Sequence, residues 1–289
     1  MMGLKIMKNG RFIQASVMMT GVFLASAYVH GHELSGGYAK LLSLQVSENI
    51  SASGLRDDGE RYRKIAVPWH SECQPAEGGV CPSVWVKGNY MDVKSDIEEE
   101  GTFHWKAYGL SVGGDMKVRL SERVSLRGGV GVGYSRIYNR SHGLEDFTEL
   151  DWQRKNVLFI SPEIEAILTF GDFSLRPGIS FLSARERPSR RKDIGTRTGS
   201  YALRGAYTFR DAFTLKGQAG NVIVGNNTGG FYGAGYRDDL GFSLVNETQV
   251  LADIPFSLGG SQLYIRTGPG ILLTDNGAKG VSFTFSLKI

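Results

Sequence analysis

The chain has few prolines, almost no cysteine, little net charge and, beyond its first 27 residues, no long apolar run. Proline occurs 8 times and cysteine 2 times in 289 residues, whereas glycine occurs 39 times. A membrane-spanning helix needs roughly 20 consecutive apolar residues, so the body of the chain is not a helical membrane protein. A composition rich in glycine, poor in proline and moderately hydrophobic fits one all-β domain.

The net charge of +4 gives no reason to expect a nucleic-acid partner. Three of the positive charges, Lys5, Lys8 and Arg11, lie in the N-terminal segment, and the rest of the chain is close to neutral. These three residues precede an apolar run over 13–27, which ends in small residues. The pattern predicts a secretory signal peptide over 1–27, cut before Tyr28 or as late as residue 31, and a mature domain over 28–289. The apolar run is too short for a membrane anchor.

The two cysteines, Cys73 and Cys81, lie eight residues apart in a polar stretch. An exported chain meets an oxidising compartment, so we expect a local disulfide between them. A metal site is the alternative, but His70 is the only further ligand nearby and does not complete one. We therefore expect neither a metal nor a cofactor.

Alternating apolar and polar residues over 157–181 form the clearest structural signal. Leu158, Ile160 and Ile164 share one face of the first stretch, while Glu163 and Glu165 share the other. A second alternating stretch follows a turn of only two residues, 171–172. Because successive strand side chains point to opposite sides, this segment predicts a hairpin with one apolar and one charged face.

The same alternation along the chain predicts about ten strands, with eight or twelve as alternatives. The expected strands lie near 37–48, 102–120, 124–138, 157–170, 173–183, 199–210, 213–224, 242–257, 263–273 and 281–289. Asn246 and Thr248 interrupt the apolar face of the eighth. Short turns at 121–123, 171–172, 211 and 257–261 alternate with long loops at 49–101, 139–156, 184–198 and 225–241. This sorting is typical of a transmembrane antiparallel up-and-down β-barrel, and aromatic residues beside the short turns fit an interfacial girdle.

The glycine-rich segment AYGLSVGGDMKVRLSERVSLRGGVGVGYSRIY, residues 107–138, resembles the strand–turn–strand unit of small bacterial outer-membrane barrels. Opacity-type, outer-membrane protein A-like and autotransporter barrels share this kind of unit. The closing GVSFTFSLKI is similar to the C-terminal strand that the outer-membrane assembly machinery recognises, although it ends in Ile289 rather than an aromatic residue. The resemblance implies a monomer in the bacterial outer membrane, with that machinery and outer-membrane lipid as partners.

Charged residues at inward positions predict a lumen network. Charges that cannot be hydrated in a narrow lumen must pair, so we expect ion pairs between strands, with a narrow anion-favouring pore as the alternative. The residues expected in the network are Asp115, Lys117, Arg119, Arg127, Glu163, Glu165, Arg176, Arg204, Lys216, Glu247 and Arg266.

The loop over 184–198 is basic, and the loop over 49–101 ends in an acidic run. Arginine's planar fork suits phosphate, so the basic loop predicts a contact with lipopolysaccharide, unless it meets the acidic loop or is simply solvated. The residues of this expected contact are Arg185, Arg187, Arg190, Arg191, Lys192 and Arg197.

Catalysis has little support in the sequence. His104 and His142 each lie near carboxylates and are the candidate acid–base residues, but the motifs of omptin proteases and a serine–histidine arrangement are not evident. We therefore expect a non-enzymatic barrel whose loops serve adhesion to an extracellular ligand, or envelope structure. The alternatives are a narrow channel with weak anion preference and, less favoured, an outer-membrane lipid A-modifying enzyme or protease.

Overall fold

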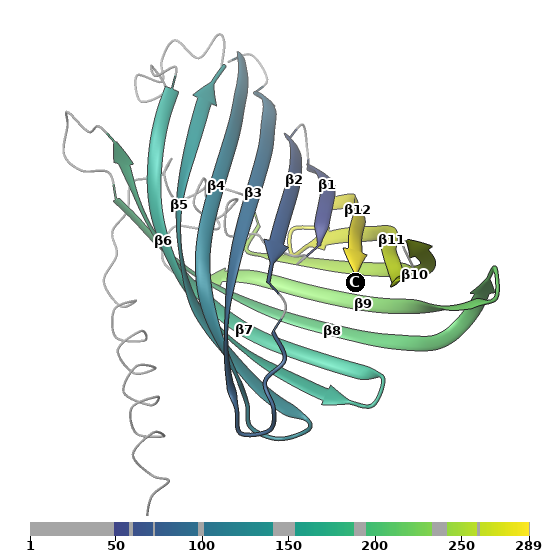
Figure 1. Ribbon diagram of the computed structural model, residues 1–289. Coiled ribbons are helices and arrows are strands. Elements are labelled where there is room, and N and C mark those ends of the chain that lie inside the picture. The colour runs from purple at the N-terminus through teal and green to yellow at the C-terminus, as the bar shows by residue number, and fades with distance from the viewer. Residues whose placement is uncertain are drawn as a thin grey trace, which may run out of the picture.

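The computed structural model describes residues 49–57, 60–71, 73–97, 101–140, 154–187, 195–232, 242–258 and 261–288. They form one closed antiparallel barrel in which each strand pairs with its neighbours in sequence and β12 pairs with β1 (Figure 1). The expected all-β transmembrane-type barrel is confirmed, with twelve strands rather than ten. The strands are β1 (Ile50–Asp57), β2 (Glu60–His70), β3 (Val80–Ile97), β4 (Gly101–Arg119), β5 (Val124–Asn139), β6 (Arg154–Phe170), β7 (Phe173–Arg187), β8 (Gly195–Leu215), β9 (Gln218–Tyr232), β10 (Leu244–Leu258), β11 (Ser261–Thr274) and β12 (Lys279–Lys288).

The expected long loop over 49–101 is wrong, because this segment forms the three strands β1, β2 and β3. The outward face of β2 carries Ile65, Val67 and Trp69, which are exposed to lipid at alternate positions. Near the start of β2 the same face carries Arg61 and Arg63. The average polarity of β2 is therefore that of a loop. The strand expected over 37–48 and the signal peptide lie outside the described residues.

The turn expected near 211 is also wrong. β8 continues to Leu215, and its register with β9 shifts between Phe209 and Phe213. Asp211 has a φ of 51° at this bulge, and its backbone N–H donates to the side-chain oxygen of Asn221. The chain reverses instead at Lys216 and Gly217, both with positive φ. β9 then runs to Tyr232, so the expected loop over 225–241 is shorter than predicted.

The barrel has two unlike ends. The turn end carries the connections 71–79, 120–123, 171–172, 216–217 and 259–260, and the loop end carries 58–59, 98–100, 140–153, 188–194, 233–243 and 275–278. Cys73 and Cys81 form the expected disulfide, with Cα atoms 6.1 Å apart. It lies in the connection 71–79 and the start of β3, at the turn end. Gly78 N–H of this connection donates to the Arg119 carbonyl, so the connection lies beside the 120–123 turn. The disulfide therefore lies in the β2–β3 connection and at the start of β3, and not in a long loop over 49–101.

An apolar cluster lies inside the barrel at the loop end, and we call it the apolar cap. Its members come from strand ends around the barrel and from Phe242, which directly precedes β10 and is 1% exposed. Tyr62 meets the Phe242 ring edge to face, with centroids 5.9 Å apart. The cap consists of Leu55, Tyr62, Met91, Val93, Trp105, Ala107, Ile137, Val157, Ala184, Phe242, Val245, Leu272 and Ala278, with Phe159 packed against it.

Candidate functional site in the barrel lumen

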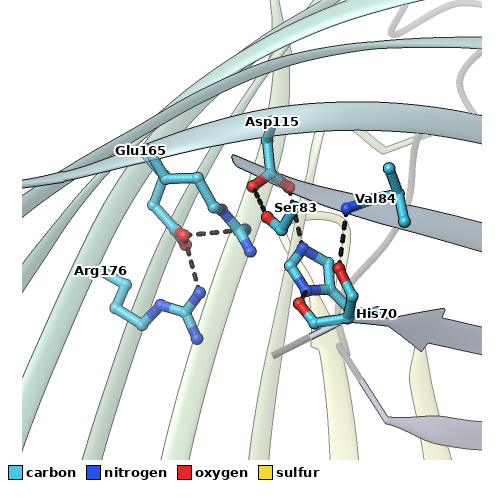
Figure 2. A network of polar contacts seen from close by, with 8 residues as sticks. His70, Ser83, Val84, Asp115, Glu165 and Arg176 are labelled. Carbon is cyan, nitrogen blue, oxygen red and sulfur yellow. Dashed lines mark hydrogen bonds and ion pairs between the residues drawn. The ribbon is translucent and has the colours of Figure 1, made fainter. Parts of the chain in front are cut away.

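Glu165 on β6 is the centre of the largest ion-pair cluster of the described lumen. Its side chain is 6% exposed and accepts from Arg127 of β5 at 2.9 Å, Arg176 of β7 at 2.7 Å and Arg204 of β8 at 2.8 Å. Figure 2 shows Arg176 reaching Glu165 across the lumen wall. All three basic residues stand at inward positions of strands neighbouring β6 or one further away. One carboxylate therefore ties four consecutive strands together and leaves an excess of positive charge.

Asp115 on β4 forms a second buried cluster. One carboxylate oxygen lies 2.8 Å from His70 Nε2, and the other accepts from the hydroxyl of Ser83 (Figure 2). His70 Nδ1 lies 2.9 Å from the carbonyl of Ser71. Ser83 contacts Asp115 and not His70, so this trio lacks the serine–histidine contact that activates a nucleophile. It anchors the end of β2 to β3 and β4.

Two further carboxylates of the lumen have partners across strands. Glu247 on β10 is 2% exposed and accepts from Ser282 of β12 and from Asn227 of β9 at 3.3 Å. Arg266 on β11 binds Asp253 of β10 through two nitrogens, at 2.6 and 2.7 Å. Buried charges that keep such partners avoid the large penalty of isolation.

The remaining residues of the expected network have different fates. Lys117 and Arg119 stand at half-buried inward positions of β4 near the turn end, and Arg119 Nε donates to the Ser121 carbonyl. Glu163 lines the lumen cavity. Lys216 is a correction: it is exposed in the β8–β9 turn, because β8 is longer than the pattern indicated.

A cavity of about 950 Å³ occupies the lumen between these clusters. Lys87, Arg127, Arg176, Arg204 and Arg266 line it as basic residues, against two glutamates. Lys87 places its ammonium 4.2 Å from the centre of the Trp85 ring. The cavity wall is therefore polar and biased towards positive charge.

The candidate catalytic residue His104 does not line this cavity. His104 lies on the outward face of β4, where Nε2 is 2.9 Å from Asp92 of β3. His142 lies outside the described residues. No group of three or more His, Cys, Asp or Glu in the described chain could hold a metal ion. The described residues also contain no helix long and apolar enough to cross a membrane.

The expected lipopolysaccharide residues are only partly described. Arg185 is exposed near the end of β7, whereas only the backbone is described for Arg187 and Arg197. Arg190, Arg191 and Lys192 lie outside the described residues.

Sequence reasoning missed His70, Ser83 and the apolar cap. The signal for His70 was present, since Ile65, Val67 and Trp69 mark one face of a strand and His70 falls on the other. Its partner Asp115 is 45 residues away. Alternation alone shows which face of a strand a residue lies on, but it does not show which residue of the neighbouring strand lies beside it.

Comparison with solved structures matches this geometry. The chain is similar to the transport unit of the autotransporter AIDA-I from Escherichia coli, at 11% identity and a TM-score of 0.54, covering 90% of this chain and 99% of that one. It is similar to the translocator domain of the autotransporter NalP from Neisseria meningitidis, at 9% identity and a TM-score of 0.53, covering 96% and 98%. The chain has the fold of an outer-membrane β-barrel. A further similarity is to the β domain of the Bordetella autotransporter BrkA, at 13% identity and a TM-score of 0.47, covering 82% and 97%.

No protein-family model matches the chain. No curated protein matches it in sequence either. At identities of 9 and 11%, the likeness of the chain to the AIDA-I and NalP barrels is one of fold.

Proposed function

We propose that the chain is an integral, non-enzymatic barrel of a bacterial outer membrane that presents surface loops for adhesion or envelope structure. The observation that carries this proposal is the apolar cap. A conducting pore needs a hydrated path through the lumen, whereas buried apolar side chains from nine of the twelve strands pack together at the loop end. Phe242 belongs to this cluster and is almost fully buried.

The ion pairs below the cap support the same proposal. Glu165, Asp253 and Asp115 each bind side chains of neighbouring strands, and buried groups with several partners rigidify the wall that contains them. A closed and rigid barrel is a suitable platform for loops at one end.

Replacement of the connections 141–153 and 188–194 by short glycine–serine linkers tests the proposal. We expect bacteria carrying this variant to lose cell–cell aggregation or attachment to epithelial monolayers, or to become sensitive to detergent, while the folded barrel still migrates faster than the boiled one on a gel. Unchanged aggregation, attachment and detergent resistance would overturn the proposed role.

The alternative is a narrow channel with weak anion preference, which the positively biased cavity favours. Planar-bilayer recording separates the two functions. We expect no discrete openings from the wild type and openings from Phe242→Ala, because removal of the ring breaches the cap. The control is Phe283→Ala, which removes an exposed ring from the lipid-facing side of β12. Discrete wild-type openings with an anion-selective reversal potential would replace the first function by the second.

A further inference from the structure

The outward face of β2 to β6 changes in character row by row towards the loop end. One row of cross-strand partners runs from β2 to β6 and consists of Val67, Gly88, Leu110, Tyr134 and Leu158. The four side chains other than Gly88 are exposed. These side chains continue the apolar band of the barrel. A lipid-facing surface has this composition within the hydrocarbon region.

The next row towards the loop end has two tyrosines at its centre, and a third tyrosine stands in the row beyond it. Tyr90 and Tyr108 are cross-strand partners with ring centroids 5.1 Å apart, and Tyr108 also meets Tyr138 at 6.0 Å. Arg136 of β5 is the cross-strand partner of Tyr108, and its guanidinium donates to the side-chain oxygen of Asn156 at 3.2 Å. Tyrosine concentrates at the level where hydrocarbon gives way to lipid headgroups.

Two basic rows lie beyond the tyrosines. Arg63, Asp92, Lys106, Tyr138 and Arg154 are aligned from β2 to β6. The outermost row aligns Lys279, Arg56, Arg61, Lys94 and His104 from β12 to β4. We call the lysines and arginines of these two rows the basic band: Arg56, Arg61, Arg63, Lys94, Lys106, Arg154 and Lys279.

Asp92 is the one acidic residue within these two rows, and its carboxylate is already engaged. It accepts from His104 Nε2 at 2.9 Å and from the Tyr90 hydroxyl at 3.4 Å. Asp96 follows on the same face of β3, beyond both rows, and its side chain is not among the described ones. The basic band therefore presents a strong surplus of positive charge to whatever lies against it.

The spacing sets the depth of this charge. Alternate residues on one strand face are about 7 Å apart, so each row lies about that far from the next. On each strand the first basic row therefore lies two steps, about 14 Å, beyond the aliphatic row, and a strand tilt of about 35–45° reduces this to about 10–11 Å of membrane depth. Phosphates of a lipid headgroup occupy this depth, and they pair with arginine through its planar fork.

We propose that the basic band binds the phosphate groups of an outer-leaflet phosphoglycolipid of the lipid A type. The occupant follows from charge complementarity and from continuity with the lipid-facing band: along the outward face of these strands apolar residues give way to basic ones in the order in which a membrane passes from hydrocarbon to headgroup, and a soluble anion would not require this order. The contact differs from the one expected at 184–198, since it uses strands on the other side of β6.

The test compares two variants of equal charge change in the full-length purified barrel. Arg63→Ser combined with Lys106→Ser removes two members of the band, whereas Arg123→Ser combined with Lys216→Asn removes two exposed charges at the turn end. Each protein is titrated in detergent with diphosphoryl and monophosphoryl lipid A, and binding is followed by native mass spectrometry.

We expect the wild type and the turn-end control to prefer diphosphoryl lipid A, and the band variant to lose about tenfold in affinity together with that preference. Migration before and after boiling establishes that each variant is folded. Equal binding by the two variants, or equal binding of both lipids by the wild type, would overturn the proposal. Displacement of lipid A by millimolar inorganic phosphate would overturn it too, because the band would then be a general phosphate site.

Discussion

At the scale of single residues, Glu165 shows how one carboxylate can organise a lumen. Three arginines from β5, β7 and β8 converge on it, and no other described carboxylate of the lumen binds as many. Without its charge the arginines would face one another in a partly desolvated space. The stability of the wall therefore depends on one residue more than on any single arginine.

We predict that Glu165→Gln destabilises the barrel by about 3–5 kcal/mol, since removal of one partner leaves buried charge uncompensated. The measurement is the urea midpoint for conversion of the fast-migrating folded form into the unfolded form on gels. Glu163→Gln is the matched control: it lines the same cavity two residues earlier on the same face of β6. Equal midpoints for the two variants would contradict a central role for Glu165.

Single residues also explain why the eighth expected strand was ambiguous. Asn246 and Thr248 stand at lipid-facing positions of β10, beside Asn226 and Thr228 of β9. Their side chains hydrogen-bond to one another, for example Asn226 Nδ2 to Thr248 Oγ1 at 2.9 Å and Asn246 Nδ2 to Thr228 Oγ1 at 2.7 Å. Polar groups facing lipid must be satisfied within the protein, and this cluster satisfies its members. Alternation of hydrophobicity cannot detect such a strand.

At the scale of elements, glycines on β4 and β5 make room for an aromatic side chain from β3. A Cβ atom added at Gly113 or Gly131 would collide with the Trp85 ring. The ring is 5% exposed and lies against these two strands inside the barrel. The glycine-rich segment that resembled other barrels therefore has a local packing reason in this chain.

We predict that Gly131→Ala destabilises the barrel by about 1–3 kcal/mol, because an added methyl group overpacks the site. Gly128→Ala is the control on the same strand, since its Cβ would meet nothing closer than the Glu163 carbonyl at 3.9 Å. Urea midpoints measure both. A larger effect at Gly128 would count against this packing.

The β11–β12 turn is tied to the start of β10 by Asp275. Its carboxylate accepts from the Ser243 N–H at 2.9 Å, the Ser243 hydroxyl at 2.6 Å and the Leu244 N–H at 3.2 Å. Burial raises the pKa of Asp275, but these hydrogen bonds outweigh it and hold that pKa below its usual value. A depressed folded-state pKa adds stability that is present above the unfolded-state pKa of about 4 and is lost as pH falls further.

We therefore predict that the Ser243 and Leu244 amides exchange faster with solvent as pH falls below about 4, beyond the intrinsic pH dependence of exchange. Asp275→Asn should show the faster exchange at neutral pH and no added change on acidification. Amides of the 171–172 turn serve as the internal reference. Protection of Ser243 that is the same in both proteins at pH 7 would argue against the tie.

The predictable and unpredictable strands differ in how far they keep one face apolar. β5 and β6 alternate cleanly over most of their length, so sequence alone located both. β2 and β3 carry apolar outward residues only near the turn end and Arg61, Arg63 or Lys94 further along. Because these strands extend beyond the apolar band, half of each reads as a polar loop.

The apolar cap escaped prediction for a related reason. Met91, Trp105 and Val157 point inward near strand ends, where alternation alone assigns polar residues to the lumen. Because the interior of the barrel is apolar at this end, inward positions carry apolar residues where the alternation predicts polar ones. The partners within the ionic clusters were equally hidden, because neighbours across strands depend on register and strand number.

At the scale of the whole molecule, the two ends of the barrel should face different compartments. We predict that a cysteine at Arg140, just after β5, is labelled by a membrane-impermeant maleimide on intact cells. A cysteine at Glu122, just before β5, should be labelled only after permeabilisation. Both are made in a Cys73→Ser, Cys81→Ser background, and both sites are exposed. The reverse pattern would invert the orientation.

The junction of β1 and β12 carries a consequence for how the barrel assembles. Ile50 pairs with Phe285 and Arg56 with Lys279, so seven residue pairs join segments more than two hundred positions apart. Every other strand junction joins neighbours in sequence and can form locally, whereas this seam has a very high contact order and must close last. Until it closes, the sheet has two unpaired edges that can recruit other chains. The seam is therefore the point at which folding is slowest and at which an assembly catalyst would have most to offer.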